Sequence, residues 1–120
     1  MSKPGPICYV EIGTTDVPRA AKFYNDIFGW QITDMNTKVY TTFSTGDGIG
    51  GGLYHIDQVK AGGGIIIYIA VDDITATLVR VNAAGGRTLV AKSEIPQTGW
   101  YGHFADPEGN HLGLYTPLSP

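Results

Sequence analysis

The sequence predicts an α+β fold built from two tandem β-α-β-β-β modules. The prediction rests on an internal repeat and on helix-capping residues that recur at the same spacing. Asp16 and Asp73 precede two helix-like stretches and are 57 residues apart, as are Gly29 and Gly86, which follow those stretches. Asp is a preferred N-cap residue, and Gly is preferred just after a helix. A repeat of this length indicates that one structural unit occurs twice.

The first module is expected at about residues 5–56. Pro18 lies in the first turn of its helix, where a missing N–H costs nothing, and the apolar residues that follow recur with helical spacing. β-type runs are separated by turn residues such as Gly46-Asp47-Gly48. The predicted elements are a helix between Asp16 and Gly29 and strands at 7–12, 30–34, 39–44 and 49–56.

The second module is expected at about residues 64–117, after a linker at 57–63, and both modules form one domain over 1–120. The tripeptides Gly52-Leu53-Tyr54 and Gly113-Leu114-Tyr115 end the two modules 61 residues apart. The longer spacing fits a longer turn at 106–110. The predicted elements are a helix between Asp73 and Gly85 and strands at 64–71, 87–92, 100–105 and 111–115.

Composition excludes several classes of function. The chain has 120 residues, a net charge of −3 and only 16% charged residues, so no basic surface is available for nucleic acid. The single cysteine excludes an internal disulfide and a cysteine metal cluster. No apolar stretch is long enough for a membrane span or a signal peptide. The sequence therefore predicts a cytoplasmic domain without nucleic-acid or membrane partners.

The repeat and two local motifs resemble the glyoxalase/bleomycin-resistance/dioxygenase superfamily, also called vicinal oxygen chelate. The motifs are Asp-Val-Pro-Arg-Ala-Ala-Lys-Phe-Tyr at 16–24 with Phe-Gly-Trp at 28–30, and Asp-Pro-Glu-Gly-Asn at 106–110. The resemblance covers nearly the whole chain. It implies a curled eight-stranded mixed sheet around a cavity and a homodimer. The superfamily includes metal-dependent lyases, isomerases and dioxygenases as well as metal-free sequestering proteins.

The resemblance also implies where a metal would be held, on the first and last strands of each module. Tyr9 stands at the usual histidine position, and the equivalent positions are Gly52, Ile66 and Gly113. Glycine and isoleucine side chains carry no donor atom for a divalent ion. We therefore expect no metal and no other cofactor. A register shift of two residues, which brings in Glu11 and His111, is the alternative that restores donors.

Period-2 alternation predicts which side chains face the cavity. Tyr9, Glu11, Ile66, Tyr68 and Ala70 alternate with apolar residues that belong under the helices. Gly50-Gly51-Gly52 carries no side chains and either opens space for a ligand or bends the sheet. The predicted ligand-binding residues are Tyr9, Glu11, Gly51, Gly52, Tyr68, Trp100, His103, His111 and Tyr115.

Glu11 is the candidate catalytic residue. A carboxylate in mid-strand on an apolar concave face costs free energy unless it is paired or hydrated. It is expected to act as a general base or as a counter-ion for a cationic ligand, or else to bond a neighbouring Tyr or Arg. Trp100 opens a strand after a Pro-Gln-Thr-Gly loop and is expected to close over the cavity. The late-strand histidines His103 and His111 are expected either to bind the ligand or to have a structural role.

Two functions follow as hypotheses. The leading one is a metal-free protein that binds a small apolar or aromatic molecule between the strands. The rival is an isomerase-, lyase- or dioxygenase-type enzyme of the same superfamily that uses Glu11 with Tyr9 or His103, without a metal. Sequestration of a cationic glycopeptide has weak support, since the net charge is only −3. The expected partners are a small-molecule ligand and a second copy of the chain.

Overall fold

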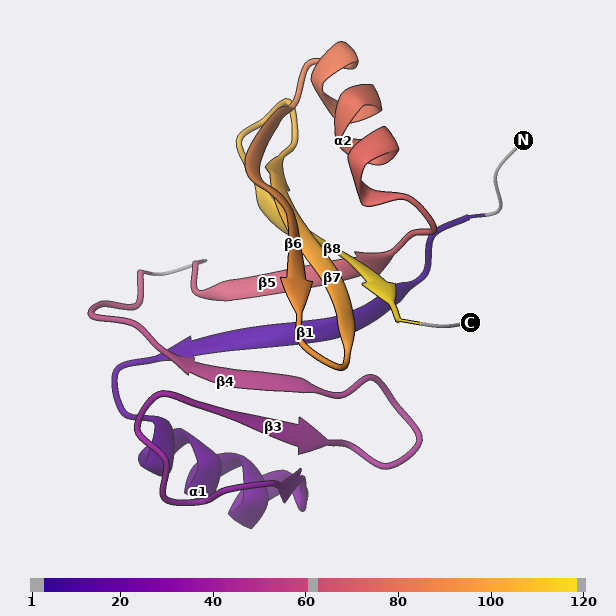
Figure 1. The fold of residues 1–120 in the computed structure, drawn as a ribbon. Coiled ribbons are helices and arrows are strands. Elements are labelled where there is room, and N and C mark those ends of the chain that lie inside the picture. Colours follow the sequence, from indigo (N-terminus) through magenta and orange to yellow (C-terminus); the bar gives the residue numbers. More distant parts are fainter. Residues whose placement is uncertain (1–3, 61–62, 119–120) are drawn as a thin grey trace. The chain divides into compact units, whose positions relative to one another are not determined.

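The computed structural model describes residues 4–60 and 63–118 (Figure 1). Residues 61–62 of the predicted linker lie outside the described residues. The elements follow in the order β1 (Ile7–Thr14), α1 (Val17–Phe28), β2 (Gln31–Ile32), β3 (Tyr40–Ser44), β4 (Gly51–His55), β5 (Ile65–Ala70), α2 (Ile74–Ala83), β6 (Arg87–Ile95), β7 (Gly99–Ala105) and β8 (His111–Pro117). This is the predicted β-α-β-β-β arrangement, twice, and the α+β class with an eight-stranded mixed sheet is confirmed.

The described residues divide into two compact units. The first unit is residues 9–66, and the second unit is residues 67–118 together with residues 4–8. In the first unit the strand order is β2-β3-β4-β1, and in the second it is β5-β8-β7-β6. β1 runs parallel to β4 and β5 runs parallel to β8, whereas the other pairs within each unit are antiparallel.

The strand register confirms the internal repeat. Glu11 on β1 pairs with Gly52 on β4, and Tyr68 on β5 pairs with Gly113 on β8. The first-strand positions are 57 residues apart and the last-strand positions are 61 apart, as the sequence predicts. In each module, therefore, a glycine of the last strand lies beside the equivalent residue of the first strand.

Capping residues define the start of both helices and the end of α1. The carboxylate of Asp16 accepts the N–H of Arg19 at 3.0 Å, and that of Asp73 accepts the N–H of Ala76 at 2.9 Å. Gly29 ends α1 with φ = 71°, the left-handed conformation that glycine adopts without strain. Among the described residues, neither helix is long and apolar enough to cross a bilayer.

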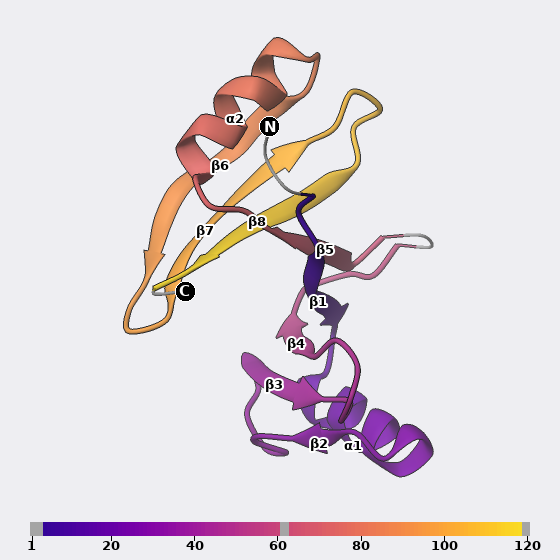
Figure 2. The same cartoon turned by 90° about the vertical axis from the view of Figure 1, so that its right-hand side faces the viewer.

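In each unit the helix lies beside that unit's own strands (Figure 2), and an apolar core lies between them. In the first unit Val17 and Ala21 of α1 pack on Phe43 and Leu53, with Ile12 against them. In the second unit the core is Ile74, Leu78 and Leu114, with other residues packed against it: Ile69, Val71, Trp100 and Phe104. These contacts confirm three predicted helix-facing residues, namely Ile12 on β1, Ile69 on β5 and Leu114 on β8.

Several strand ends differ from the predicted ones. β1 continues to Thr14 and β6 continues to Ile95, whereas β2 shortens to Gln31–Ile32. The register of β6 against β7 shifts between Thr88 and Val90 and again between Val90 and Ser93. Such bulges break the period-2 pattern that marks a strand in sequence, so the prediction ends β6 too early.

Replacement of a fully buried leucine tests the core of the first unit. Leu53 is 0% exposed, and Leu53→Ala leaves a cavity that the strand cannot close. We expect the free energy of unfolding to fall by about 2–5 kcal/mol, measured by urea denaturation. Val39→Ala is the control, because Val39 is 72% exposed. Equal losses in both variants would contradict the assigned core.

Candidate functional site

In the first unit, three polar side chains form a hydrogen-bonded chain on the sheet face opposite α1. The hydroxyl of Tyr40 on β3 donates to Oε2 of Glu11 on β1 at 2.8 Å. The hydroxyls of Tyr9 and Tyr40 lie 2.5 Å apart. Since Tyr40 uses its only proton on Glu11, Tyr9 donates to the Tyr40 oxygen. The chain therefore runs from Tyr9 through Tyr40 to Glu11, and we call it the tyrosine–glutamate cluster.

Gly52 makes room for this cluster. A Cβ at Gly52 would lie 2.1 Å from Oη and 2.3 Å from Cζ of Tyr40, so the Tyr40 ring lies directly over Gly52. Gly51 faces a different environment, since its Cβ would meet the carbonyl oxygen of Val10 and the buried ring of Phe43. Of the two predicted glycines, only Gly52 lies beneath the cluster.

Burial sets the ionisation of these phenols. Desolvation raises the pKa of Tyr40 well above its usual range, and its hydrogen bonds to Tyr9 and Glu11 and the charge of Glu11 raise it further. Desolvation also raises the pKa of Tyr9, with a smaller opposing contribution from its bond to Tyr40. Both hydroxyls are therefore neutral hydrogen-bonding groups at ordinary pH.

In the second unit, Tyr68 and two histidines form an equivalent chain. The Tyr68 hydroxyl on β5 lies 2.8 Å from Nε2 of His103 on β7. Nδ1 of His103 lies 2.8 Å from Nε2 of His111 on β8. Each of these hydrogen bonds needs one atom that donates a proton and one that accepts it. With neutral histidines, the donors can therefore all point from Tyr68 toward His111 or all point from His111 toward Tyr68. We call it the tyrosine–histidine cluster.

Gly113 has the role in the second unit that Gly52 has in the first. A Cβ at Gly113 would lie 2.3 Å from Cε2 of Tyr68, and the Tyr68 side chain is buried at 7% exposure. The ring of Tyr68 therefore lies over Gly113. The two modules use tyrosines from different strands, β3 in the first and β5 in the second, to cover the same glycine position.

The remaining predicted residues lie outside these two clusters. Trp100 packs against the core under α2, and Nζ of Lys92 lies 4.8 Å from its ring centroid. This corrects the expectation that Trp100 closes over the cavity face, because Trp100 and His103 project to opposite sides of β7. The Tyr115 hydroxyl donates to the carbonyl oxygen of Thr98 at 3.3 Å.

Tyr40 belongs to the tyrosine–glutamate cluster and Tyr101 borders the tyrosine–histidine cluster, although the sequence analysis did not select either residue. The ring of Tyr101 meets that of His103 edge-on, with centroids 5.7 Å apart. On β3 the buried residues Thr41 and Phe43 alternate with exposed ones. This alternation could have identified Tyr40, because it places Tyr40 on the sheet face opposite the helix and the core.

The residues at the metal positions implied by the family resemblance do not fit a metal ion. Gly52 and Gly113 lie under tyrosine rings, and Ile66 offers only hydrocarbon. A phenol held as a neutral donor, as Tyr9 is, is a poor ligand for a divalent cation. Among the described residues, no group of three or more His, Cys, Asp or Glu side chains is arranged to hold a metal ion.

Gly113→Ala tests the contact between the glycine and the ring. The new Cβ displaces Tyr68, breaks its bond to His103, and lowers the free energy of unfolding by about 1–3 kcal/mol. Urea denaturation measures the loss, and the histidine NMR signals report the broken bond. Gly63→Ala is the control, because the nearest atom there is 3.5 Å away. An undiminished cost of Gly113→Ala in a Tyr68→Ala background would contradict this account.

Alkaline titration tests the tyrosine–glutamate cluster. The folded-state pKa values of Tyr9 and Tyr40 are raised, so their contribution to stability is complete below the unfolded pKa of about 10 and is lost as pH rises above it. We expect the urea midpoint to fall above about pH 10, and less steeply in Tyr40→Phe. Tyrosinate absorbance that develops at the same pH in native and urea-unfolded protein would refute the assignment.

Comparison with known proteins places the chain in a family. The model of the Glyoxalase/Bleomycin resistance protein/Dioxygenase superfamily matches residues 7–114. A glyoxylase-like domain-containing protein of Didymella fabae is 36% identical, with 93% of this chain and 94% of that protein covered. The anthracycline biosynthesis protein DnrV of Streptomyces peucetius is 31% identical over 93% of this chain, which spans only 47% of that relative.

The solved structures agree on the fold. The Mn(II)-bound glyoxalase from Novosphingobium aromaticivorans superposes with a TM-score of 0.73 at 21% identity, covering 97% of this chain and 40% of that chain. At 21% identity, this likeness supports only the fold. Sequence match, module repeat and fold agree, and the chain belongs to the Glyoxalase/Bleomycin resistance protein/Dioxygenase superfamily.

Proposed function

We propose that this chain binds a small aromatic or largely apolar molecule, without a metal ion, through the tyrosine-bearing faces of its sheet. One observation carries the proposal. At Gly52 and Gly113, two of the positions where the family resemblance implies metal ligands, a tyrosine ring occupies the space that a side chain would need. Each unit thereby gains a phenol in place of a cation ligand.

The chemistry of the clusters supports an aromatic ligand with polar substituents. Rings such as Tyr40 and Tyr101 offer faces and edges for stacking. Glu11 and the histidines offer acceptors and donors that fix the orientation of a hydroxyl or carbonyl group. The relative named for anthracycline biosynthesis is consistent with this class, since anthracyclines are flat, hydroxylated polycyclic molecules.

Superfamily enzymes suggest a second candidate, an isomerase or epimerase that uses Glu11 as general base. The favouring observation is that the Glu11 carboxylate accepts a hydrogen bond from the neutral phenol of Tyr40, which in turn is bonded to the neutral phenol of Tyr9. Glu11 would take a proton from the carbon next to a substrate carbonyl and return it to another position. Tyr9 would donate its hydroxyl proton to the carbonyl oxygen in a hydrogen bond, exchanging Tyr40 for the substrate.

Binding of a hydroxylated anthraquinone, followed by quenching of protein fluorescence, tests the leading candidate. We expect saturable binding that is unchanged by EDTA or by added Mn²⁺, Ni²⁺ or Zn²⁺. Tyr40→Phe is expected to weaken it about tenfold, because Glu11 and Tyr9 lose the hydroxyl that orients them toward the ligand. Tyr24→Phe is the matched control, because Tyr24 stacks on Trp30 beside the α1 core.

The same probe separates the outcomes. Binding that EDTA abolishes and a metal restores would refute the metal-free proposal, as would equal losses in Tyr40→Phe and Tyr24→Phe. Absence of binding to any hydroxylated polycyclic probe would refute the ligand class. Glu11→Gln distinguishes the two candidates, because an enzyme loses turnover while it keeps affinity, and a binding protein changes only in affinity.

A further inference from the structure

The tyrosine–glutamate cluster of the first unit uses both of its phenolic protons internally. The Tyr9 hydroxyl donates to the oxygen of Tyr40 at 2.5 Å, and the Tyr40 hydroxyl donates to Oε2 of Glu11 at 2.8 Å. A phenol carries one proton and two acceptor lone pairs, and a carboxylate only accepts. The cluster therefore offers acceptor atoms to a ligand, but it has no phenolic proton left to donate.

A third phenol beside the cluster is also used as a donor. Tyr54 on β4 pairs with Tyr40 on β3, so the two rings lie on the same sheet face. The Tyr54 hydroxyl donates to the carbonyl oxygen of Gly64 at 3.1 Å. Desolvation raises the pKa of Tyr54, and the charge of Glu11 raises it further. Tyr54 therefore keeps its proton at ordinary pH and gives it to the backbone.

The backbone beneath the cluster supplies no donor in place of the phenols. β4 lies between β1 and β3, and Gly52 pairs with Glu11 on one side and with Thr42 on the other. The N–H groups of such a central strand are used in the ladders on its two edges. A ligand above Gly52 therefore finds no equivalent of an oxyanion hole, which needs free N–H groups.

The acceptor atoms of the cluster are within reach of a ligand. Tyr40 is 38% exposed, and Tyr9 and Glu11 are half-buried. A carboxylate has about four lone-pair sites, and the bond from Tyr40 uses one of them. A hydrogen bond from a neutral hydroxyl to a carboxylate is roughly twice as strong as a bond between two neutral groups. The cluster therefore favours a ligand that brings its own donor.

A ligand without a donor is disfavoured for the same reason. An ether or ketone oxygen placed here faces other acceptors, and it gains a hydrogen bond only if the bond between Tyr9 and Tyr40 breaks. A ligand carboxylate or phenolate also meets the like charge of Glu11. The number of protons in the cluster thus discriminates among ligands of similar shape.

We propose, resting on the proposed function, that the tyrosine–glutamate cluster selects aromatic ligands with a free, neutral hydroxyl group. Phenols of this kind bind through donation to Glu11 or to a tyrosine oxygen. Their methyl ethers, ketones without a hydroxyl group and aromatic carboxylates bind more weakly, and a phenol loses its advantage when its hydroxyl ionises.

Four substituted anthraquinones test this selectivity on the wild-type chain by fluorescence quenching. The 2-hydroxy compound has a free donor, the 2-methoxy compound has none, and the 2-carboxylate is an anion. The 1-hydroxy isomer has the composition of the 2-hydroxy compound, but its hydroxyl already donates to the adjacent quinone oxygen. At about pH 6, where the hydroxyl groups are protonated, the 2-hydroxy compound is expected to bind about tenfold or more tightly than each of the others.

Glu11→Gln locates the selectivity in the cluster. The glutamine carbonyl can still accept from Tyr40, while its amide group supplies the donor that the wild-type cluster lacks. The preference for the 2-hydroxy over the 2-methoxy compound is expected to fall about tenfold. Glu94→Gln is the matched control, because it makes the same change of charge at an exposed position of β6 in the second unit. Circular dichroism and the urea midpoint verify that both variants fold.

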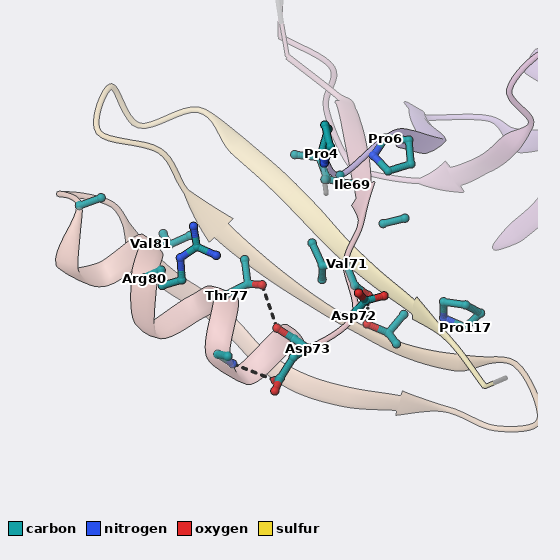
Figure 3. Close-up of a pocket in the computed structure, with 15 residues that line it drawn as sticks. Pro4, Pro6, Ile69, Val71, Asp72, Asp73, Thr77, Arg80, Val81 and Pro117 are labelled. Atoms are coloured by element: carbon teal, nitrogen blue, oxygen red, sulfur yellow. Dashed lines mark hydrogen bonds between the residues drawn. The ribbon is translucent and has the colours of Figure 1, made fainter. Parts of the chain in front are cut away.

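A groove beside α2 in the second unit needs a separate control (Figure 3). Its volume of about 860 Å³ is large enough for the same probes. It is lined by Arg80, whose guanidinium group donates and never accepts, so its preference is the reverse of that of the cluster. Arg80→Ala is expected to remove binding of the 2-carboxylate at this groove and to leave the preference for the 2-hydroxy compound unchanged.

The outcomes separate this inference from the proposed function. Binding of none of the four probes would overturn both. Equal affinity for the 1-hydroxy and 2-hydroxy isomers, or for the 2-hydroxy and 2-methoxy compounds, would overturn the selectivity alone and leave the ligand class in place. This comparison needs only the wild-type chain, so it decides even if Glu11→Gln does not fold. A preference that a folded Glu11→Gln variant retains, or that Glu94→Gln reduces equally, would also overturn the inference.

Discussion

The close contact between a tyrosine ring and the backbone of a glycine is the constraint on which both clusters depend. At Gly52 the ring comes from β3, and at Gly113 it comes from β5. Any side chain at either position would enter the space of the ring and separate Tyr40 from Glu11 or Tyr68 from His103. Glycine is thus required here for close approach rather than for backbone flexibility.

This constraint determines the chemistry that each sheet face offers. At each of these glycines a tyrosine ring occupies the space of a side chain, so the face presents aromatic surface with oriented hydroxyl groups. The hydrogen bonds run through Tyr40 to Glu11 in one unit and through His103 to His111 in the other. The proposed function follows from such faces, since rings and oriented hydroxyl groups suit molecules with ring systems and polar substituents better than cations that need several anionic ligands.

The sequence predicts much of the fold because its strongest signals are local. Asp16 and Asp73 cap their helices, Gly29 adopts positive φ, and the repeat spacing reproduces the pairing of Glu11 with Gly52 and of Tyr68 with Gly113. It predicts less of the clusters, because Tyr40 reaches Glu11 only through pairing of strands far apart in sequence. Trp100 is misplaced because an aromatic residue that opens a strand looks the same whether it faces the helix or the other side. The large α1 residues resemble core residues for the same reason, and only their exposure in the structure distinguishes Phe28 from Phe43.

Metal titration of the untagged chain by calorimetry, together with elemental analysis after purification in metal-supplemented medium, tests the central claim most directly. The account predicts less than one tenth of an ion per chain, and only weak, non-saturating heats with Mn²⁺, Fe²⁺, Ni²⁺ or Zn²⁺, roughly millimolar or weaker. One tightly held ion per chain, released when Glu11→Gln or His111→Asn is introduced, would contradict it.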